Sequence, residues 1–428
     1  MWTRLGLACS LVAVVLHGGA ADAQSPTPIR YNEGPGIKLG DALVFHPGIA
    51  VEGRYDSNVF YTDGAKGAPY LRLIGHLDIS TLSPQRLTDG SGIVHRPKVN
   101  FRFKTAVGYR EYLSGDASVK GQRAVELNAG IGLGVLQGRP FSFDIVDEFS
   151  RTVSARNYEG PDTLARDMNR GSVKFTITPG GGRLSFDVGY ANLIDVFEES
   201  SFNWANHMTH EILFNAKWRL LPKTALALDV LQRFTNYYNA SSAPVAKVNS
   251  MPFRASLGLL GLITTRLSII LKAGYGNSIH KTAPSYNMFI GKAELGYQFA
   301  PTATLRGGFE HLFEDSMYGN YYTDELAYLR YNHAIMQRFI LNLGAEYRYR
   351  QYKGLPATGA ATTPDLQQHL VIVGASFDWQ IQEWVYIGIG YDMQVRAGAS
   401  GGAAGMTGFI GSNNFQKHQV YGKVGFSY

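Results

Sequence analysis

The sequence predicts an all-β fold: a transmembrane, antiparallel, up-and-down β-barrel of about 18 strands, with about 16 as the alternative count. Segments of about ten residues alternate apolar and polar side chains from residue 44 onward, and tight turns alternate with long loops between them. The composition agrees, because Gly makes up 49 of 428 residues, aromatic residues 12% and charged residues only 17%. A disordered chain would be richer in charge and poorer in aromatic residues. No apolar run beyond the N-terminus reaches the roughly 20 residues of a membrane-spanning helix, which excludes a polytopic helical protein.

The first 23 residues are expected to be a secretory signal peptide, which is removed from the mature protein. Arg4 supplies the positive charge, residues 5–16 form the apolar stretch, and Ala21 and Ala23 mark a small-residue cleavage site. The alternative, a membrane anchor, is disfavoured because the apolar stretch is shorter than the ~18 residues of a span. Cleavage removes the single cysteine, Cys9, so we expect neither disulfides nor thiolate metal sites. Residues 24–43 are then an extended, Pro- and Gly-rich periplasmic segment, and residues 44–428 form the barrel.

Each expected strand has one apolar and one polar face, because successive side chains of a strand point to opposite sides of the sheet. In the first strand, Phe45, Ile49 and Val51 alternate with His46 and Glu52. The same alternation runs through 45–55, 71–80, 99–110, 125–135, 141–145, 184–190, 211–219, 226–233, 267–275, 292–299, 338–350, 385–396 and 420–428. It is weakest at 168–177, 251–261 and 323–331, and these segments decide between the two strand counts.

Alternation alone fits a soluble sandwich as well as a membrane barrel, so the connections and the ends of the strands must decide. Short connections such as 137–140 and 221–223 interleave strictly with long loops such as 151–167 and 397–414, which is typical of the two rims of an outer-membrane barrel. Aromatic residues gather where strands meet loops, as in a membrane-interface girdle. This aromatic set comprises Tyr55, Phe60, Tyr61, Tyr109, Tyr112, Tyr237, Tyr238, Tyr321, Tyr322, Tyr347, Tyr349 and Tyr352.

The sequence ends on Tyr428, on the apolar phase of the last expected strand. Outer-membrane barrels commonly end in this way, and the barrel-assembly machinery reads the terminal strand. With an even strand number both termini lie in the periplasm and the long loops lie outside the cell. We therefore expect the protein in the outer membrane of a Gram-negative bacterium, in contact with lipid.

A barrel of about 18 strands is too wide for side chains to fill, which implies a channel unless loops fold into it. Function must then lie on the polar inner face. Its charges are mixed, so they form either a solvated wall of compensating ion pairs or a surface that guides a hydrated, anionic polymer. The predicted pore-lining residues are Arg54, Arg72, Arg102, Lys104, Arg110, Glu126, Asp144, Asp187, Lys217, Arg219, Asp229, Arg233, Lys272, Lys292, Glu294, Arg306, Glu310, Arg338, Glu346, Arg348 and Arg350.

The sequence contains no recognisable catalytic, cofactor-binding or metal-binding pattern, and we predict that the protein is not an enzyme. The glycines of residues 130–134 resemble a dinucleotide fingerprint but lie inside an expected strand and open no helix. His207 and Glu211 share one strand face while His210 lies on the other, which is not a helical metal motif. A Ser-His-acid set on the barrel wall is the enzymatic alternative, but no G-x-S-x-G motif marks it. Positive charge is spread along the chain without a run, which argues against nucleic acid as a partner.

Residues 52–61, Glu-Gly-Arg-Tyr-Asp-Ser-Asn-Val-Phe-Tyr, follow Gly-Ile-Lys-Leu-Gly at 36–40 and His-Pro-Gly-Ile at 46–49. Together they resemble a family of β-barrel porins encoded beside polysaccharide-secretion genes, in which the motif YDSNVFY recurs at the first extracellular hairpin. The resemblance covers the mature chain in length and layout. It implies an outer-membrane channel for an exported polysaccharide, working with a periplasmic polysaccharide-export protein. The alternative from the residues alone is a general or substrate-selective diffusion porin, or a barrel with a structural role.

Overall fold

The computed structural model describes residues 34–82, 98–153, 165–239, 247–281, 285–316, 320–336, 338–353, 366–400 and 414–428. Its main element is a closed antiparallel barrel of eighteen strands, β2 to β19, in which each strand pairs with its neighbours in the sequence and β19 pairs with β2. The strands are β2 (Leu43–Asp56), β3 (Ala68–Thr81), β4 (Val99–Tyr112), β5 (Ala124–Val135), β6 (Phe141–Thr152), β7 (Arg166–Ile177), β8 (Leu184–Phe197), β9 (His207–Leu221), β10 (Thr224–Tyr237), β11 (Phe253–Leu262), β12 (Leu267–Asn277), β13 (Asn287–Ala300), β14 (Ala303–Asp315), β15 (Tyr321–Ile335), β16 (Phe339–Lys353), β17 (Leu366–Gln382), β18 (Val385–Ser400) and β19 (Phe415–Ser427). The predicted fold class and the count of 18 are confirmed.

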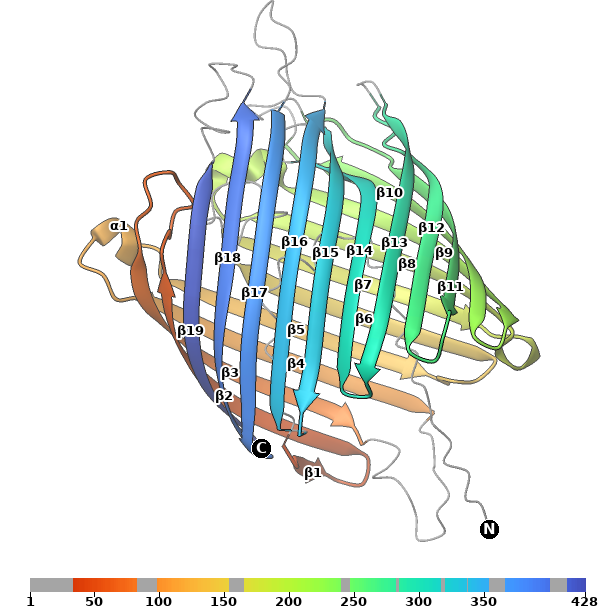
Figure 1. Cartoon of the computed structure of the whole chain (residues 1–428), viewed down its shortest axis with the longest axis horizontal. Coiled ribbons are helices and arrows are strands. Elements are labelled where there is room, and N and C mark those ends of the chain that lie inside the picture. The colour runs from red at the N-terminus through yellow and green to blue at the C-terminus, as the bar shows by residue number, and fades with distance from the viewer. Residues whose placement is uncertain are drawn as a thin grey trace, which may run out of the picture.

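A short additional strand, β1 (Ile37–Leu39), pairs with the start of β2. Gly34 lies so close to the chain end that a Cβ there would overlap the carbonyl of Ser427 and the backbone of Tyr428. The backbone N–H of Tyr428 in turn donates to the carbonyl of Pro47 at 3.0 Å. The segment predicted as 24–43 therefore carries, in its described part, a hairpin with β2 at the end of the barrel where the chain finishes (Figure 1). The expected signal peptide lies outside the described residues.

The two ends of the barrel differ in the length of their connections. We call the end that holds β1 and Tyr428 the terminus end, and the opposite one the loop end. Turns at the terminus end are as short as 222–223 and 301–302, while the loop end carries connections such as 238–252 and 401–414. The strict interleaving expected from the sequence is wrong in two places: the long connection 82–98 lies at the terminus end, and the short connection 316–320 at the loop end.

Helices are confined to connections at the barrel rims, in the part of the chain that the structure describes. The helix α1 (Ala117–Lys120) projects beside the loop end (Figure 1). The 3-10 turns η2 (Gly180–Gly182) and η3 (Ser200–Ala205) lie between strands. No helix in the described ranges is long and apolar enough to cross a membrane. In the loop at α1, Lys66 and Ser118 donate hydrogen bonds to the Asp116 carboxylate, and these bonds hold its pKa below the ordinary value.

Apolar side chains cover the outside of the barrel. Ile49, Leu73, Leu257, Leu295 and Ile389 are each more than half exposed to solvent in the isolated chain. Exposed apolar side chains occur on all eighteen strands of the barrel, whereas the intervening positions carry the charged residues together with glycines and smaller numbers of buried apolar residues. A closed barrel with this outer face is stable only in a bilayer, because water would meet an apolar band around its circumference. The protein is thus a transmembrane β-barrel of the Gram-negative outer membrane.

The aromatic set predicted as a girdle divides between the two faces of the wall. Tyr55 and Tyr347 are 51% and 43% exposed and point outward, as a girdle requires. In contrast Tyr112, Tyr322 and Tyr352 are buried on the inner phase of their strands, so their assignment to the girdle is wrong. Strand phase, and not closeness to a loop, decides which way a ring points.

Ring side chains on the inner face lie flat over glycines at the seam where the barrel closes. Tyr386 lies opposite Gly425 and Tyr421 opposite Gly390 in the β18–β19 pair, and a Cβ at either glycine would overlap the ring. His76 covers Gly48 between β2 and β3 in the same way. Glycine is needed at these positions because the rings take the space of the missing side chains. The flat rings shield the exposed glycine backbone and leave the centre of the barrel clear of aromatic bulk.

The motif at residues 55–61 fastens the first and last strands of the barrel to each other. Asp56 is fully buried, and one of its carboxylate oxygens pairs with Lys417 of β19 at 2.9 Å and accepts from Gln419 at 3.0 Å, while the other accepts from the backbone N–H of Asn58 at 2.9 Å. Asn58, also fully buried, donates to the carbonyls of Thr62 and Gln416 at 2.7 and 3.2 Å. The Lys417 ammonium lies 3.4 Å from the centre of the Tyr61 ring. The residues that carry the family resemblance therefore stabilise barrel closure.

Candidate functional site: the inner face of the barrel

The inner face near the seam carries an ion-pair network that we call the seam network, formed by Glu52, Arg54, Arg72, Arg110 and Glu126. Glu52 accepts from Arg54 at 3.0 Å and from Arg72 at 3.3 Å. Glu126 accepts from Arg72 at 2.5 Å and from Arg110 at 3.1 Å. The contacts join β2, β3, β4 and β5, which are consecutive strands.

Aromatic rings cover the guanidinium groups of the seam network. Arg54 lies 4.1 Å from the centre of the Tyr421 ring, and Arg110 lies 5.7 Å from that of Tyr70 and 5.9 Å from that of Tyr112. Charge-assisted bonds to carboxylates and contact with ring faces are both suited to arginine, whose planar group has five donors. The network thus lies flat along the wall and reinforces it.

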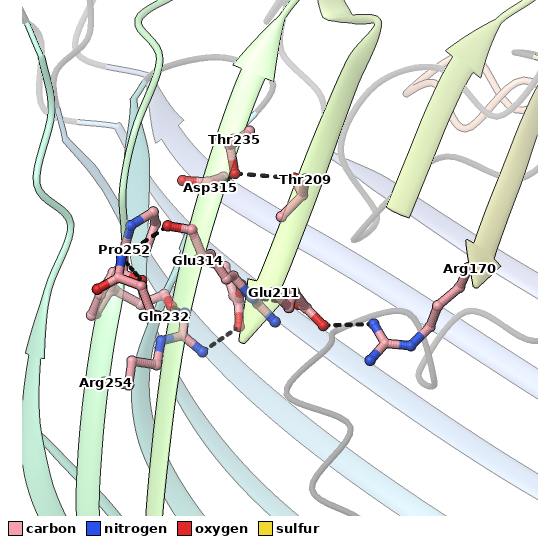
Figure 2. A network of polar contacts seen from close by, with 11 residues as sticks. Arg170, Thr209, Glu211, Gln232, Thr235, Pro252, Arg254, Glu314 and Asp315 are labelled. Carbon is pink, nitrogen blue, oxygen red and sulfur yellow. Dashed lines mark hydrogen bonds and ion pairs between the residues drawn. The ribbon is translucent and has the colours of Figure 1, made fainter. Parts of the chain in front are cut away.

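A second network, which we call the hairpin network, joins strands that are not neighbours. Glu211 of β9 accepts from Arg170 of β7 and from Arg233 of β10, both at 2.7 Å (Figure 2). Arg233 also donates to Glu314 of β14 at 3.1 Å, and Arg254 of β11 donates to the other oxygen of Glu314 at 3.0 Å. Glu314 is buried, although β12 and β13 stand between its strand and that of Arg254 in the sheet order.

The tip of the β14–β15 hairpin, residues 312–316 and 320–323, lies inside the barrel and explains this long reach. The register of β14 with β13 ends at Gly291 and His311, whereas its register with β15 continues to Asp315 and Tyr321. Phe309 and Phe313 share one strand phase. Phe309 is 47% exposed on the outside, but Phe313 is only 1% exposed and lies against the inner surface of β12. Between His311 and the loop end, the hairpin therefore leaves the wall and bends inward.

Several contacts hold the hairpin tip against the inner surface of β10 to β12. A Cβ on Gly276 would lie 2.5 Å from the Phe313 ring, so only glycine leaves room for it there. The guanidinium of Arg254 lies 4.6 Å from the centre of the same ring and donates to the Phe313 carbonyl. Lys247 donates to the carbonyl of Ser316. Thr235, itself bonded to Thr209, lies 3.5 Å from Asp315 (Figure 2).

A third group of ion pairs occupies β15 and β16. Asp324 accepts from Arg348 at 2.7 Å and from Arg350 at 3.4 Å, and Glu346 accepts from Arg330 at 2.7 Å and from Arg348 at 3.3 Å. Like the other two networks, it combines three arginines with two carboxylates, and all of these residues except Arg330 lie between the middle of their strands and the loop end. The buried pairs of Asp324 with Arg348 and Arg350 keep their geometry because each charge has a hydrogen-bonded partner, whereas Arg330 is exposed.

The predicted pore-lining residues lie on the inner phase of their strands, with one exception. Arg338 lies in the turn between β15 and β16, outside both strands. Ion pairs on this face away from the three networks include Arg102–Asp78 (2.6 Å), Lys104–Glu148 (3.0 Å), Lys174–Asp144 (3.4 Å), Lys272–Asp229 (2.7 Å) and Lys292–Glu310, while Asp187 accepts from Thr176 (2.6 Å) and Glu294 from Tyr328. Lys217, Arg219 and Arg306 are exposed. That these residues line an open pore stays a prediction.

Sequence reasoning missed four members of these networks: Arg170 and Glu314 of the hairpin network, and Arg330 and Asp324 of the group on β15 and β16. Strand phase could have found Arg330 and Asp324, since they alternate with outward residues of β15. The alternation of apolar and polar residues gives no sign of the inward bend at Glu314. The tip has left the wall there, so neither of its faces meets lipid and no apolar face is required. Within the described residues, no group of three or more His, Cys, Asp or Glu side chains could hold a metal ion. His210 bonds Tyr190 on the outer face at 2.7 Å, away from the buried His207 and Glu211, as predicted.

No protein-family model and no curated protein matches this chain. Among solved structures it is similar to OccK2 (OpdF) of Pseudomonas aeruginosa, solved in complex with glucuronate, with a TM-score of 0.48 and 10% identity over 90% of this chain and 98% of that one. It is also similar to OccAB3 of Acinetobacter baumannii (TM-score 0.47, 10% identity, 90% and 99% covered). A third similar structure is the FrpB iron transporter of Neisseria meningitidis, with a TM-score of 0.47 and 9% identity over 90% of this chain and 81% of that one. At these values the likeness identifies neither a family nor a substrate.

Proposed function

We propose that the protein is an outer-membrane channel through which a polysaccharide leaves the cell, assisted by a periplasmic export partner. The observation that carries the proposal is the inner face: polar and ion-paired side chains occur on every wall segment from the terminus end to the loop end. A wall whose charges are mostly paired with neighbours binds a passing solute weakly at many points, which suits the movement of a hydrated polymer.

The hairpin of β1 with β2 supports a docking role for the N-terminal segment at the terminus end. Ile37 and Leu39 are 44% and 43% exposed there, beside the chain end. In bacterial barrels this end faces the periplasm. An ordered segment at the periplasmic mouth gives an export protein a fixed surface to contact, which a diffusion porin does not need.

The second candidate, a substrate-selective diffusion porin, is favoured by the inward tip of the β14–β15 hairpin. A tip held inside the barrel narrows the passage, and a narrow passage discriminates small solutes by size and charge. In either case the protein is a channel and not an enzyme, and its partners are outer-membrane lipid and the machinery that assembles barrels.

Gene deletion separates the two candidates. For a polysaccharide channel, we expect deletion to stop surface display or release of one exopolysaccharide while small-solute permeability stays nearly unchanged. If every surface polysaccharide persists and small-solute uptake falls, the diffusion porin is the correct assignment. The docking role is tested by deleting residues 25–35, which should leave the barrel assembled but impair export. Normal export by that variant would contradict docking.

A further inference from the structure

We propose that the tip of the β14–β15 hairpin is the element that sets the effective width of the channel, held in place by two separate contacts. The proposal rests on the proposed function, since it assumes that solute crosses the barrel. One contact is the Phe313 ring on Gly276, and the other is the Glu314 carboxylate between Arg233 and Arg254.

The inward position of the tip follows first from the strand pairing. The pairing of β14 with β13 ends at His311 and Gly291, so from His311 toward the loop end the hairpin is free to leave the wall. Its connection, residues 316–320, is too short to form a surface loop that could cover the barrel from outside. The two strands themselves therefore bend inward, and their main-chain pairing keeps the tip stiff.

The first contact is one of shape. Gly276 is on the inner phase of β12, because its neighbour Tyr275 is 47% exposed on the outside. The Phe313 ring lies against this glycine and near Ile290, whose Cγ2 would be 3.2 Å from an added Cβ. Any side chain at 276 must displace the ring from β12, and with it the tip, which then moves toward the loop end and out of the passage.

The second contact is one of charge. Glu314 is buried and its two oxygens accept from Arg233 and Arg254, which come from different strands. Arg233 is shared with Glu211, so the tip is tied to the network of the wall. Removing the negative charge of Glu314 leaves Arg233 with Glu211 and takes this carboxylate from the partly buried Arg254, so the attraction between the tip and the wall weakens and a tip that has moved away is favoured.

The tip stands directly across the barrel from the seam network. In a closed ring of eighteen strands, β12 is opposite β3, which carries Arg72. Solute is thus confined between the tip on one side and Arg54, Arg72 and Arg110 on the other. Displacing the tip widens this passage without touching the seam.

The test is single-channel conductance of the full barrel in planar bilayers, with folding checked by the heat-modifiable migration of the barrel on gels. Gly276→Leu and Glu314→Gln should each raise conductance at least two-fold. The matched control is Gly344→Leu, which adds the same volume to the inner face of β16, where nothing lies within 4 Å of the new Cβ. Its conductance should equal that of the wild type or fall below it.

The outcomes separate the two proposals. A wild-type barrel that conducts, with unchanged conductance in both folded variants, overturns the constriction but leaves the channel. A silent wild type with conducting variants supports the constriction as a complete barrier. Folded barrels that are all silent overturn the channel and the constriction together. Because the mature chain is expected to lack cysteine, Thr235→Cys with Asp315→Cys offers a second measurement. Oxidation of this pair in a Glu314→Gln background should restore the low conductance, and failure to restore it despite a formed disulfide contradicts the proposal.

Discussion

The seam network and the hairpin network use the same chemistry, arginines shared between glutamates, for different purposes. The seam network joins β2 to β5, which are already held together by main-chain hydrogen bonds. The hairpin network joins β14 to β10 and β11, which the sheet keeps apart. In the first case ion pairs stiffen a structure that would exist without them. In the second they help to hold a position that the strand pairing of the sheet does not specify. Four experiments break or sharpen this comparison.

The largest effect is expected at the loop end of the seam. Asp56→Ala leaves the buried ammonium of Lys417 without its carboxylate, which should lower the free energy of unfolding by about 3–5 kcal/mol. Urea unfolding in detergent or vesicles measures the change. The double variant with Lys417→Met should recover much of the loss, since no charge is then left buried. A single variant as stable as the wild type would show that closure does not depend on this pair.

The wall between the two regions tests which face meets lipid. Leu343→Arg places a charge on the outside of β16 and should cost about 2 kcal/mol, because the penalty of about 2–4 kcal/mol at the bilayer midplane falls toward the interfaces. Asn342→Arg, on the inner phase beside Ser376, should be tolerated. Assembly yield in the outer membrane and unfolding in urea measure both variants. Equal losses in the two variants would contradict the assignment of the faces.

Paired substitutions compare the networks directly. Glu126→Gln weakens the two bonds to Arg72 and Arg110 and should cost about 1–3 kcal/mol of stability without altering conductance. Glu314→Gln should do the reverse, with a clear gain in conductance and little loss of stability, because the freed tip can move to water. If both variants shift the same quantity, the distinction between a wall network and a positioning network is lost.

The smallest effect is expected outside the barrel wall. Lys66 and Asp116 join two loops at 2.8 Å, but both side chains are largely exposed. Solvent screens such pairs. Lys66→Ala should therefore unfold at the same urea concentration as the wild type, within error. Loss of the hydrogen bond raises the Asp116 pKa toward its ordinary value, which titration by NMR can follow. A strongly destabilised variant would mean that the loops contribute to closure.

The strands were predictable from sequence because a lipid-facing band forces alternation of period two. One of the three weakest predicted segments, 323–331, lies in β15, where Asp324, Tyr328 and Arg330 on the inner phase alternate with outward residues. The seam contacts of Asp56 and Asn58 were not predictable, since a sequence motif does not say which distant strand it meets. The position of the hairpin tip was missed for a physical reason. Between His311 and the loop end the tip packs on the inner surface of the wall and is not a part of the lipid-facing sheet, so its side chains need not alternate between apolar and polar.

The pairing of β2 with β19 affects the order in which the barrel folds. Gln419 and Asp56 are 363 positions apart, and the closing pair brings together the most distant parts of the polypeptide. Such a contact forms slowly and late, since a long loop must be ordered before it stabilises anything. Until β19 arrives, β2 and β18 each expose an unpaired edge, which is prone to add foreign strands. The buried aspartate, asparagine and lysine at this junction therefore act on the last and most hazardous step of assembly, where the sheet stops being a ribbon with two edges and becomes a ring with none.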